Sequence, residues 1–162
     1  MVSSKVHFTQ YMNDSFEEEI QNLFFFHPDQ KTYKKRILQS IIKFGKPELI
    51  NHESGLTFRL VGNSDSHQTL FVHSKQGDSI LLGIVIWVKT ENTMNLAHLL
   101  LNKSFTPSEN EYNFREIMLG LIKMSSFFKG IDSIGLVYTN KKIPLIKLGT
   151  YLTDLSHFNY LL

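Results

Sequence analysis

The stretch Ser79-Ile80-Leu81-Leu82-Gly83-Ile84-Val85-Ile86-Trp87-Val88 decides the fold of this chain. It is an almost unbroken apolar run, followed by a polar segment and by a second apolar run from Met94 to Leu101. The β-branched residues and the polar turn favour a strand that is buried on both faces over a helix. A helix that crosses a bilayer needs about 20 apolar residues, so this run is too short to span one. The two runs therefore predict the central hairpin of a sheet.

Composition predicts one packed domain over residues 1–162. Hydrophobic residues make up 42% of the chain and charged residues 20%, a balance that is typical of a globular protein rather than a disordered one. A chain of this length buries roughly two thirds of its unfolded surface. The formal net charge is +2, from 17 basic and 15 acidic residues, so the composition does not indicate a nucleic-acid partner.

Cysteine is absent from the chain. Its absence excludes disulfides, thiolate catalysis and cysteine metal sites. The first residues lack the basic and then apolar layout of a signal peptide. We therefore expect a cytoplasmic protein that has no membrane partner.

The segment before the central hairpin predicts a strand, two helices and further strands. Lys5 to Tyr11 alternates polar and apolar side chains, as a half-buried strand does. One helix is expected to start at a capping box formed by Ser15 and its neighbours, and a second to cover Gln30 to Phe44. From Leu56 to Val61, and again from Gln68 to His73, the period becomes that of strands. With the central hairpin, these strands predict an antiparallel meander.

The segment after the hairpin predicts a long helix, from Ser108 to Lys129, that lies across the sheet. Ser108 and Glu111 form a capping box at its start. Apolar residues recur along it at spacings of three and four: Phe114, Ile117, Met118, Leu121, Ile122 and Phe128. Three shorter elements are expected beyond it: a strand over Ile131 to Tyr138, a helix over Ile143 to Leu148 with Gly149 as its C-terminal cap, and a strand over Phe158 to Leu162.

These elements predict an α+β fold with a mixed, mostly antiparallel sheet, two N-terminal helices on one side and the long helix packed across it. Their order resembles that of the GNAT superfamily of N-acyltransferases. The resemblance is carried by Gln76-Gly77-Asp78-Ser79-Ile80-Leu81-Leu82-Gly83, at the turn before the long central strand, and by Asp132 to Asn140, the strand that splays away from it. It implies a V-shaped opening between Met94 to Leu101 and Ile134 to Tyr138, in which acyl-CoA would lie.

The resemblance also implies roles for residues around that opening. Backbone groups of Leu99, Leu100 and Leu101 would contact the pantetheine arm, and Asn140 would contact the CoA side of the splay. The start of the long helix would face the pyrophosphate with Asn110, Glu111, Tyr112, Asn113, Phe114 and Arg115. The implied cofactor is acetyl-CoA or another acyl-CoA, and the implied acceptor is a small-molecule or peptide amine.

The chain departs from the family pattern in two places. The family signature R/Q-x-x-G-x-G/A binds the pyrophosphate through free backbone N–H groups, but Thr106 to Phe114 contains no glycine. The predicted capping box would also occupy N–H groups of the same helix start. The short helix after Asn140 lacks the usual tyrosine, so Tyr138 is the fallback general acid and Tyr151 the next substitute. General burial preferences favour a core position for either tyrosine over a catalytic role.

His98 is the candidate general base. It interrupts an apolar strand, and an unperturbed histidine pKa of about 6.5 suits deprotonation of an amine. A satisfied core histidine would give the same pattern. His73 and His98 lack a third ligand, so the sequence predicts no metal site. Motifs of serine hydrolases, P-loop proteins, dinucleotide-binding proteins and zinc proteases are absent from the chain.

Two alternatives stand beside an acyl-CoA-dependent N-acyltransferase. The first is a non-catalytic GNAT-shaped sensor or protein-interaction module, paired as a homodimer through its sheet edge or aromatic tail. It fits the missing glycine signature and the missing tyrosine. The second is an unrelated α+β binding domain whose strand order mimics the family. Parallel, splayed neighbours around Leu101 and Ile134 would favour the family, and a closed antiparallel pair would favour mimicry.

Overall fold

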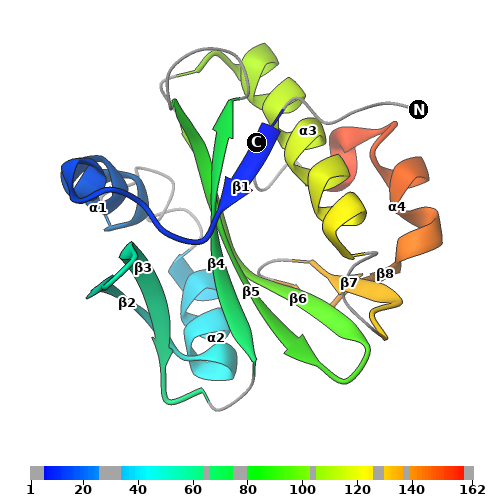
Figure 1. Ribbon diagram of the computed structural model, residues 1–162. Helices are drawn as coiled ribbons and strands as arrows, with labels where there is room; N and C mark the ends of the chain where they lie inside the picture. The colour runs from blue at the N-terminus through cyan, green and yellow to red at the C-terminus, as the bar shows by residue number, and fades with distance from the viewer. Residues whose placement is uncertain are drawn as a thin grey trace.

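A six-stranded, mostly antiparallel sheet forms the centre of the fold, with helices on both of its faces (Figure 1). The computed structural model describes residues 6–25, 34–63, 66–74, 80–102, 105–125, 130–136 and 139–158. The strands of the sheet, in spatial order, are β1 (Val6–Thr9), β4 (His67–Ser74), β5 (Leu81–Thr90), β6 (Thr93–Leu101), β7 (Ser133–Gly135) and β8 (Lys142–Pro144). The predicted α+β class with a mixed, mostly antiparallel sheet is confirmed.

The helices surround this sheet. They are η1 (Asp14–Phe16), α1 (Glu17–Phe25), α2 (Lys34–Phe44), α3 (Pro107–Ser125), α4 (Leu145–Tyr151) and η3 (Leu155–Phe158). No helix in the described part of the chain is long and apolar enough to span a membrane.

Strands β5 and β6 form the predicted central hairpin. Their ladder runs from the pair Gly83 and Leu101 to the pair Thr90 and Thr93. The turn places Glu91 at a φ of 51°, in the left-handed region. Both strands read as continuous apolar runs because the sheet is covered on both faces, which removes the need for polar residues at alternate positions.

The two faces of the sheet bury separate apolar clusters. On the face covered by α3, α4 and η3, which we call the α3 face, the buried stripe of α3 packs on alternate residues of β5 and β6. That stripe is the predicted one, with Phe114, Ile117, Met118 and Leu121 fully buried. The opposite face, the N-terminal face, buries Ile20 and Phe44 from α1 and α2. The long helix and the two N-terminal helices therefore lie where the sequence predicts.

The predicted antiparallel meander is confirmed for β4, β5 and β6 and is wrong for its first strand. Strand β3 (Gly55–Val61) pairs with β2 (Lys46–His52) in a separate two-stranded sheet and is not in the sheet that contains β4. Thr69 Oγ1 donates to the Phe58 carbonyl at 3.2 Å, and the Leu60 N–H donates to His67 Nε2 at 3.4 Å. Strand β2 is hidden in the sequence because Pro47, which occupies a position in it, also reads as the residue that stops a helix.

Helix boundaries differ from the sequence prediction at several points. The first helical turn is capped by Asn13, whose side chain accepts from the Ser15 N–H at 2.9 Å, so the predicted Ser15 capping box is wrong. Near the C-terminus, Gly149 lies inside α4, and Leu152 takes the C-cap position. Phe158 ends a 3-10 helix rather than starting a strand, and residues 159–162 lie outside the described part of the chain.

Candidate functional site

Strands β6 and β7 are parallel neighbours for a short distance only. Thr93, Met94 and Asn95 pair with residues 133–135, and the ladder ends there although β6 continues to Leu101. This arrangement is the parallel pair that the family resemblance implies, and it differs from the closed antiparallel pair expected for mimicry.

A β-bulge lies directly beyond the last of these pairs. In the β5 ladder, Trp87 opposes Leu96 and Ile86 opposes His98, so Ala97 is an extra residue in β6. A bulge bends its strand and increases the local twist. On the near side of the bulge, the Asn95 side chain donates to Thr90 Oγ1 at 2.6 Å and fixes the first part of β6. The bulge therefore bends β6 just beyond its last pair with β7.

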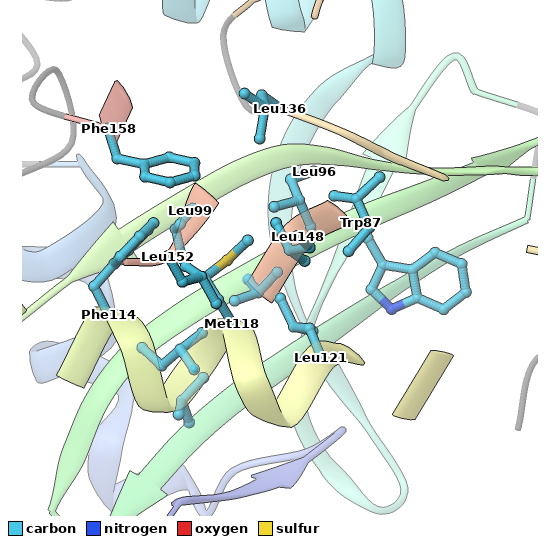
Figure 2. Close-up of a cluster of buried hydrophobic side chains, with 14 of the residues drawn as sticks. Trp87, Leu96, Leu99, Phe114, Met118, Leu121, Leu136, Leu148, Leu152 and Phe158 are labelled. Atoms are coloured by element: carbon cyan, nitrogen blue, oxygen red, sulfur yellow. The ribbon is translucent and has the colours of Figure 1, made fainter. Parts of the chain in front are cut away.

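Apolar side chains of the chain itself pack beside β6 on the α3 face (Figure 2). Leu96 and Leu99 of β6 belong to the same buried cluster as Leu136, which follows β7. The ring of Phe114 lies 4.9 Å from that of Phe158, centre to centre, and joins the start of α3 to the C-terminal segment. Phe114 is fully buried, so its side chain belongs to the core of the chain.

The start of α3 is closed by its own capping box. The Glu109 N–H donates to Thr106 Oγ1 at 3.2 Å, and Glu109 Oε1 accepts from the Thr106 N–H at 3.0 Å. Hydrogen bonds from the backbone and from the side chain of Thr106 to the Glu109 carboxyl lower the pKa of this group, which therefore stays ionised at neutral pH. The predicted box of Ser108 and Glu111 is wrong by two residues. Pro107 carried the missing signal, because proline favours the first helical position and makes the preceding residue the cap.

The described residues at this helix start do not fit the diphosphate of CoA. A diphosphate needs unoccupied N–H groups in the first turn. Here Pro107 has no N–H, and the N–H groups of Thr106, Glu109 and Asn110 all donate within the chain. A carboxylate already complements the positive end of the helix, so a second anion would meet like charge. The start of α3 therefore supports no reaction step that involves bound CoA.

The other residues predicted for CoA do not share one surface. Asn110 and Asn113 are buried, while Glu111 is exposed. Tyr112 and Asn113 line a small cavity of about 190 Å³ that lies against β1 and the start of β5, away from β7. Arg115 donates through Nε to the Leu152 carbonyl at 3.1 Å, so it ties α3 to the end of α4.

The remaining predicted residues are divided between the two faces. Leu99 and Leu101 belong to the α3-face cluster, and Leu100 belongs to the N-terminal-face cluster. Asn140 is exposed in the segment before β8. Tyr138 lies outside the described residues, and Tyr151 is half-buried at the end of α4.

His98 lies inside the protein. It opposes Ile86 of β5, and directly opposed residues share a face, so its side chain lies on the N-terminal face. Only 1% of the residue is exposed, and burial lowers its pKa to about 4. The ring is therefore neutral at pH 7 and has no direct contact with solvent. Among the described residues, no group of three or more His, Cys, Asp or Glu could hold a metal ion.

A cleft that the sequence did not predict lies at the edge of β4. It has a volume of about 380 Å³, and we call it the β4 edge cleft. Its walls come from the segment after β1, the outer side of the β2–β3 hairpin, the first half of β4 and one residue of β5. Residues that give it its chemistry are Tyr11, Thr57, Arg59, His67, Gln68 and Trp87. Aromatic surface, hydrogen-bonding groups and one permanent cation meet there.

The cleft is present because β1 covers only part of β4. Strand β1 pairs with Phe71 to Ser74, and at Gln10 the chain bends away so that Met12 can bridge to Leu56 of β3. Beyond Phe71, β3 takes the place of β1 beside β4, with Leu60 bonded to His67 and Phe58 bonded to Thr69. The alternating polar residues of β3 were the one sequence signal for this wall.

Comparison of the chain with protein-family models, with curated proteins and with solved structures finds no match.

Proposed function

We propose that this chain is a GNAT-shaped domain that acts as a non-catalytic sensor or protein-interaction module. The observation that carries the proposal is the start of α3, where Thr106 and Glu109 satisfy each other's backbone groups. In a GNAT-like acyltransferase, these are the groups that would hold the CoA diphosphate. An incoming diphosphate would have to break the capping box and lie beside an ionised carboxylate, both of which oppose binding.

Two further features support this proposal. The apolar cluster beside β6 includes C-terminal residues of the chain, among them Leu152 and Phe158. CoA would have to displace these packed side chains in order to bind there. The histidine in the position of a general base is buried and has a low pKa. A cytoplasmic location and self-association as a homodimer belong to the same proposal.

A second candidate function is an acyl-CoA-dependent N-acyltransferase that acts on an amine. One observation favours it: β6 and β7 are parallel, and the bulge at Ala97 follows their last pair in β6. In this case, ligand binding would have to rearrange the capping box and expose His98.

Isothermal titration calorimetry with acetyl-CoA separates the two candidates. The titration uses the wild-type protein, the Glu109→Gln variant and, as a control, the Glu53→Gln variant, which removes an exposed carboxylate in the β2–β3 turn. We expect no heat of binding with any of them. Measurable binding to wild type, strengthened in Glu109→Gln and unchanged in Glu53→Gln, would replace the proposed function with the acyltransferase.

A further inference from the structure

Two histidine rings stack on each other where β1 pairs with β4. His7 of β1 directly opposes His73 of β4, and the ring centres are 4.9 Å apart with the ring planes inclined by 16°. His73 also opposes Leu81 of β5, a member of the N-terminal-face cluster, so both rings lie on that face of the sheet. His7 is exposed, whereas only 3% of His73 is exposed. The buried ring of His73 therefore lies beneath a ring that β1 supplies.

The surroundings of His73 satisfy only one of its two ring nitrogens. Its Nε2 lies 2.8 Å from Thr9 Oγ1 of β1, and either atom can be the donor. Its Nδ1 is buried and has no hydrogen-bond partner among the described residues. A neutral ring carries one N–H group, whereas a protonated ring carries two and needs two acceptors. A protonated His73 would therefore keep a buried N–H group without an acceptor, which is unfavourable.

The charges around His73 also favour the neutral ring. Burial lowers the pKa of His73, and the nearby His7 lowers it further. The other elements on this face are η1, α1, α2 and the β2–β3 hairpin, and the acidic residues described in them are all exposed: Asp14, Glu17, Glu18, Glu19, Glu48 and Glu53. The basic and histidine side chains described in these elements are exposed as well: Lys35, Lys43, Lys46, His52 and Arg59. Within the sheet, His67 lies at the other end of β4 and His98 lies in β6. No buried carboxylate among the described residues of this face is thus available to compensate a charge on His73.

Strand β1 is short enough to detach without unfolding of the whole domain. It has four residues, and in the described part of the chain β4 is the one strand that pairs with it. On the α3 face, the buried Val6 and the half-buried Phe8 hold it in place. A short strand at the edge of a sheet opens at a lower free energy than a central hairpin does. Detachment removes Thr9 and His7 from His73 and gives its ring access to water.

We propose that His7 and His73 form a pH-sensitive switch, which holds β1 on β4 while His73 is neutral and releases β1 when His73 takes up a proton. In the open state, the hydrated ring of His73 has the ordinary histidine pKa of about 6.5. Below this pH, proton uptake stabilises the open state relative to the closed one, by at most about tenfold per pH unit. Release makes β4 the edge strand of the sheet and exposes the backbone groups of Phe71 to Ser74.

Amide hydrogen exchange of the whole chain, measured by NMR, tests the switch. Protection factors correct each rate for the intrinsic pH dependence of exchange. The protection factors of the β1 amides should fall about fivefold to tenfold between pH 7 and pH 5.5, which is the effect of one proton. They should also stay below those of the β5 amides at each pH, because β1 opens while the central hairpin stays folded.

Histidine variants assign the proton. His73→Gln should abolish the pH dependence of β1 protection, and His7→Gln, at an exposed position, should reduce it because it removes the neighbouring charge. His52→Gln is the matched control. His52 is exposed and stacks on Tyr11 at 5.0 Å, so its loss should leave the pH dependence of β1 protection unchanged. His98→Gln should reduce the pH dependence of β5 protection and leave that of β1 unchanged.

Three outcomes would overturn the inference. Constant β1 protection factors between pH 7 and pH 5.5 would show that no proton is coupled to opening. An equal fall in His7→Gln and in wild type, or in His73→Gln and in wild type, would assign the proton to another group. Equal protection in β1 and β5 at every pH would show that β1 leaves β4 only when the whole domain unfolds.

Discussion

The space beside β6 and the space at the edge of β4 differ in whether side chains of the chain itself fill them. Beside β6, where the strand order suggests a cofactor, Phe114 and Phe158 fill the interior and Glu109 closes the helix start. At the edge of β4, where no motif indicates a site, a polar cleft remains. The comparison teaches that strand topology and ligand space are separate properties. Backbone pairing determines the strand topology. The side chains that fill the gaps between the strands and helices determine how much space is left for a ligand.

Truncation of the Phe114 side chain should have the largest effect on stability. Phe114 is fully buried and packs on Phe158, so Phe114→Ala should lower the free energy of unfolding by about 3 to 5 kcal/mol. Urea unfolding measures the change. Ile146→Ala is the control, because Ile146 is 92% exposed and its truncation should change stability by less than about 0.5 kcal/mol. A small loss in Phe114→Ala would mean that the space beside β6 is loosely filled and accessible to a ligand.

The pH dependence of stability tests how dry the N-terminal face of the sheet is around His98. The pKa of His98 is about 4 in the folded protein and near 6.5 in the unfolded chain, so the unfolded chain binds the extra proton first as the pH falls. The contribution of neutral His98 to the free energy of unfolding is fully present above pH 6.5. It is lost as the pH falls from 6.5 to 4. At about 1.4 kcal/mol per pKa unit, the loss is on the order of 3 kcal/mol.

Urea unfolding at several pH values, on wild type and on His98→Gln, isolates this contribution. The variant should lose less stability than wild type between pH 6.5 and pH 4, because glutamine does not titrate. Parallel curves for the two proteins would show that His98 titrates normally in the folded state. The N-terminal face of the sheet would then be open to water at His98.

The capping box of α3 has a smaller expected effect. Thr106→Ala should reduce stability by about 1 kcal/mol, since it removes the side chain that accepts from the Glu109 N–H. Ser108→Ala should change stability by less than about 0.5 kcal/mol, because Ser108 is not the cap. Thermal or urea unfolding compares the two. A larger loss of stability in Ser108→Ala than in Thr106→Ala would instead support the capping box of Ser108 and Glu111 that the sequence alone predicts.

The smallest effect should come from the rim of the β4 edge cleft. Glu48→Gln removes the exposed ion pair with Arg59 and should change the free energy of unfolding by less than about 1 kcal/mol. Urea unfolding at low and at high salt gives the value. A loss well above this limit would mean that Arg59 is needed for structure and is not available to a partner.

The sequence predicts the central sheet because its signal is long and consistent. The apolar runs of β5 and β6 and the stripe on α3 each repeat over many residues, so single exceptions do not hide them. Strand β2 gives no such repeated signal. Pro47 and four charged or polar residues obscure its weak alternation of apolar and polar side chains.

The candidate site was less predictable. Two overlapping capping boxes, Thr106 with Glu109 and Ser108 with Glu111, fit the same letters, and only the position of Pro107 separates them. The β4 edge cleft depends on where β1 ends relative to β4, which is a matter of tertiary pairing. No local pattern near Arg59 or Trp87 carries that information.

The bulge at Ala97 gives β6 one residue more than its ladder with β5 requires. When Ala97 is skipped, the remaining residues of β6 alternate without a break between the two clusters: Leu96 and Leu99 face α3, and His98 and Leu100 face the N-terminal helices. A deletion of this one residue would therefore keep every other side chain of β6 on its present face and remove the bend. The bend of β6 thus depends on a single residue of chain length rather than on the identity of any side chain.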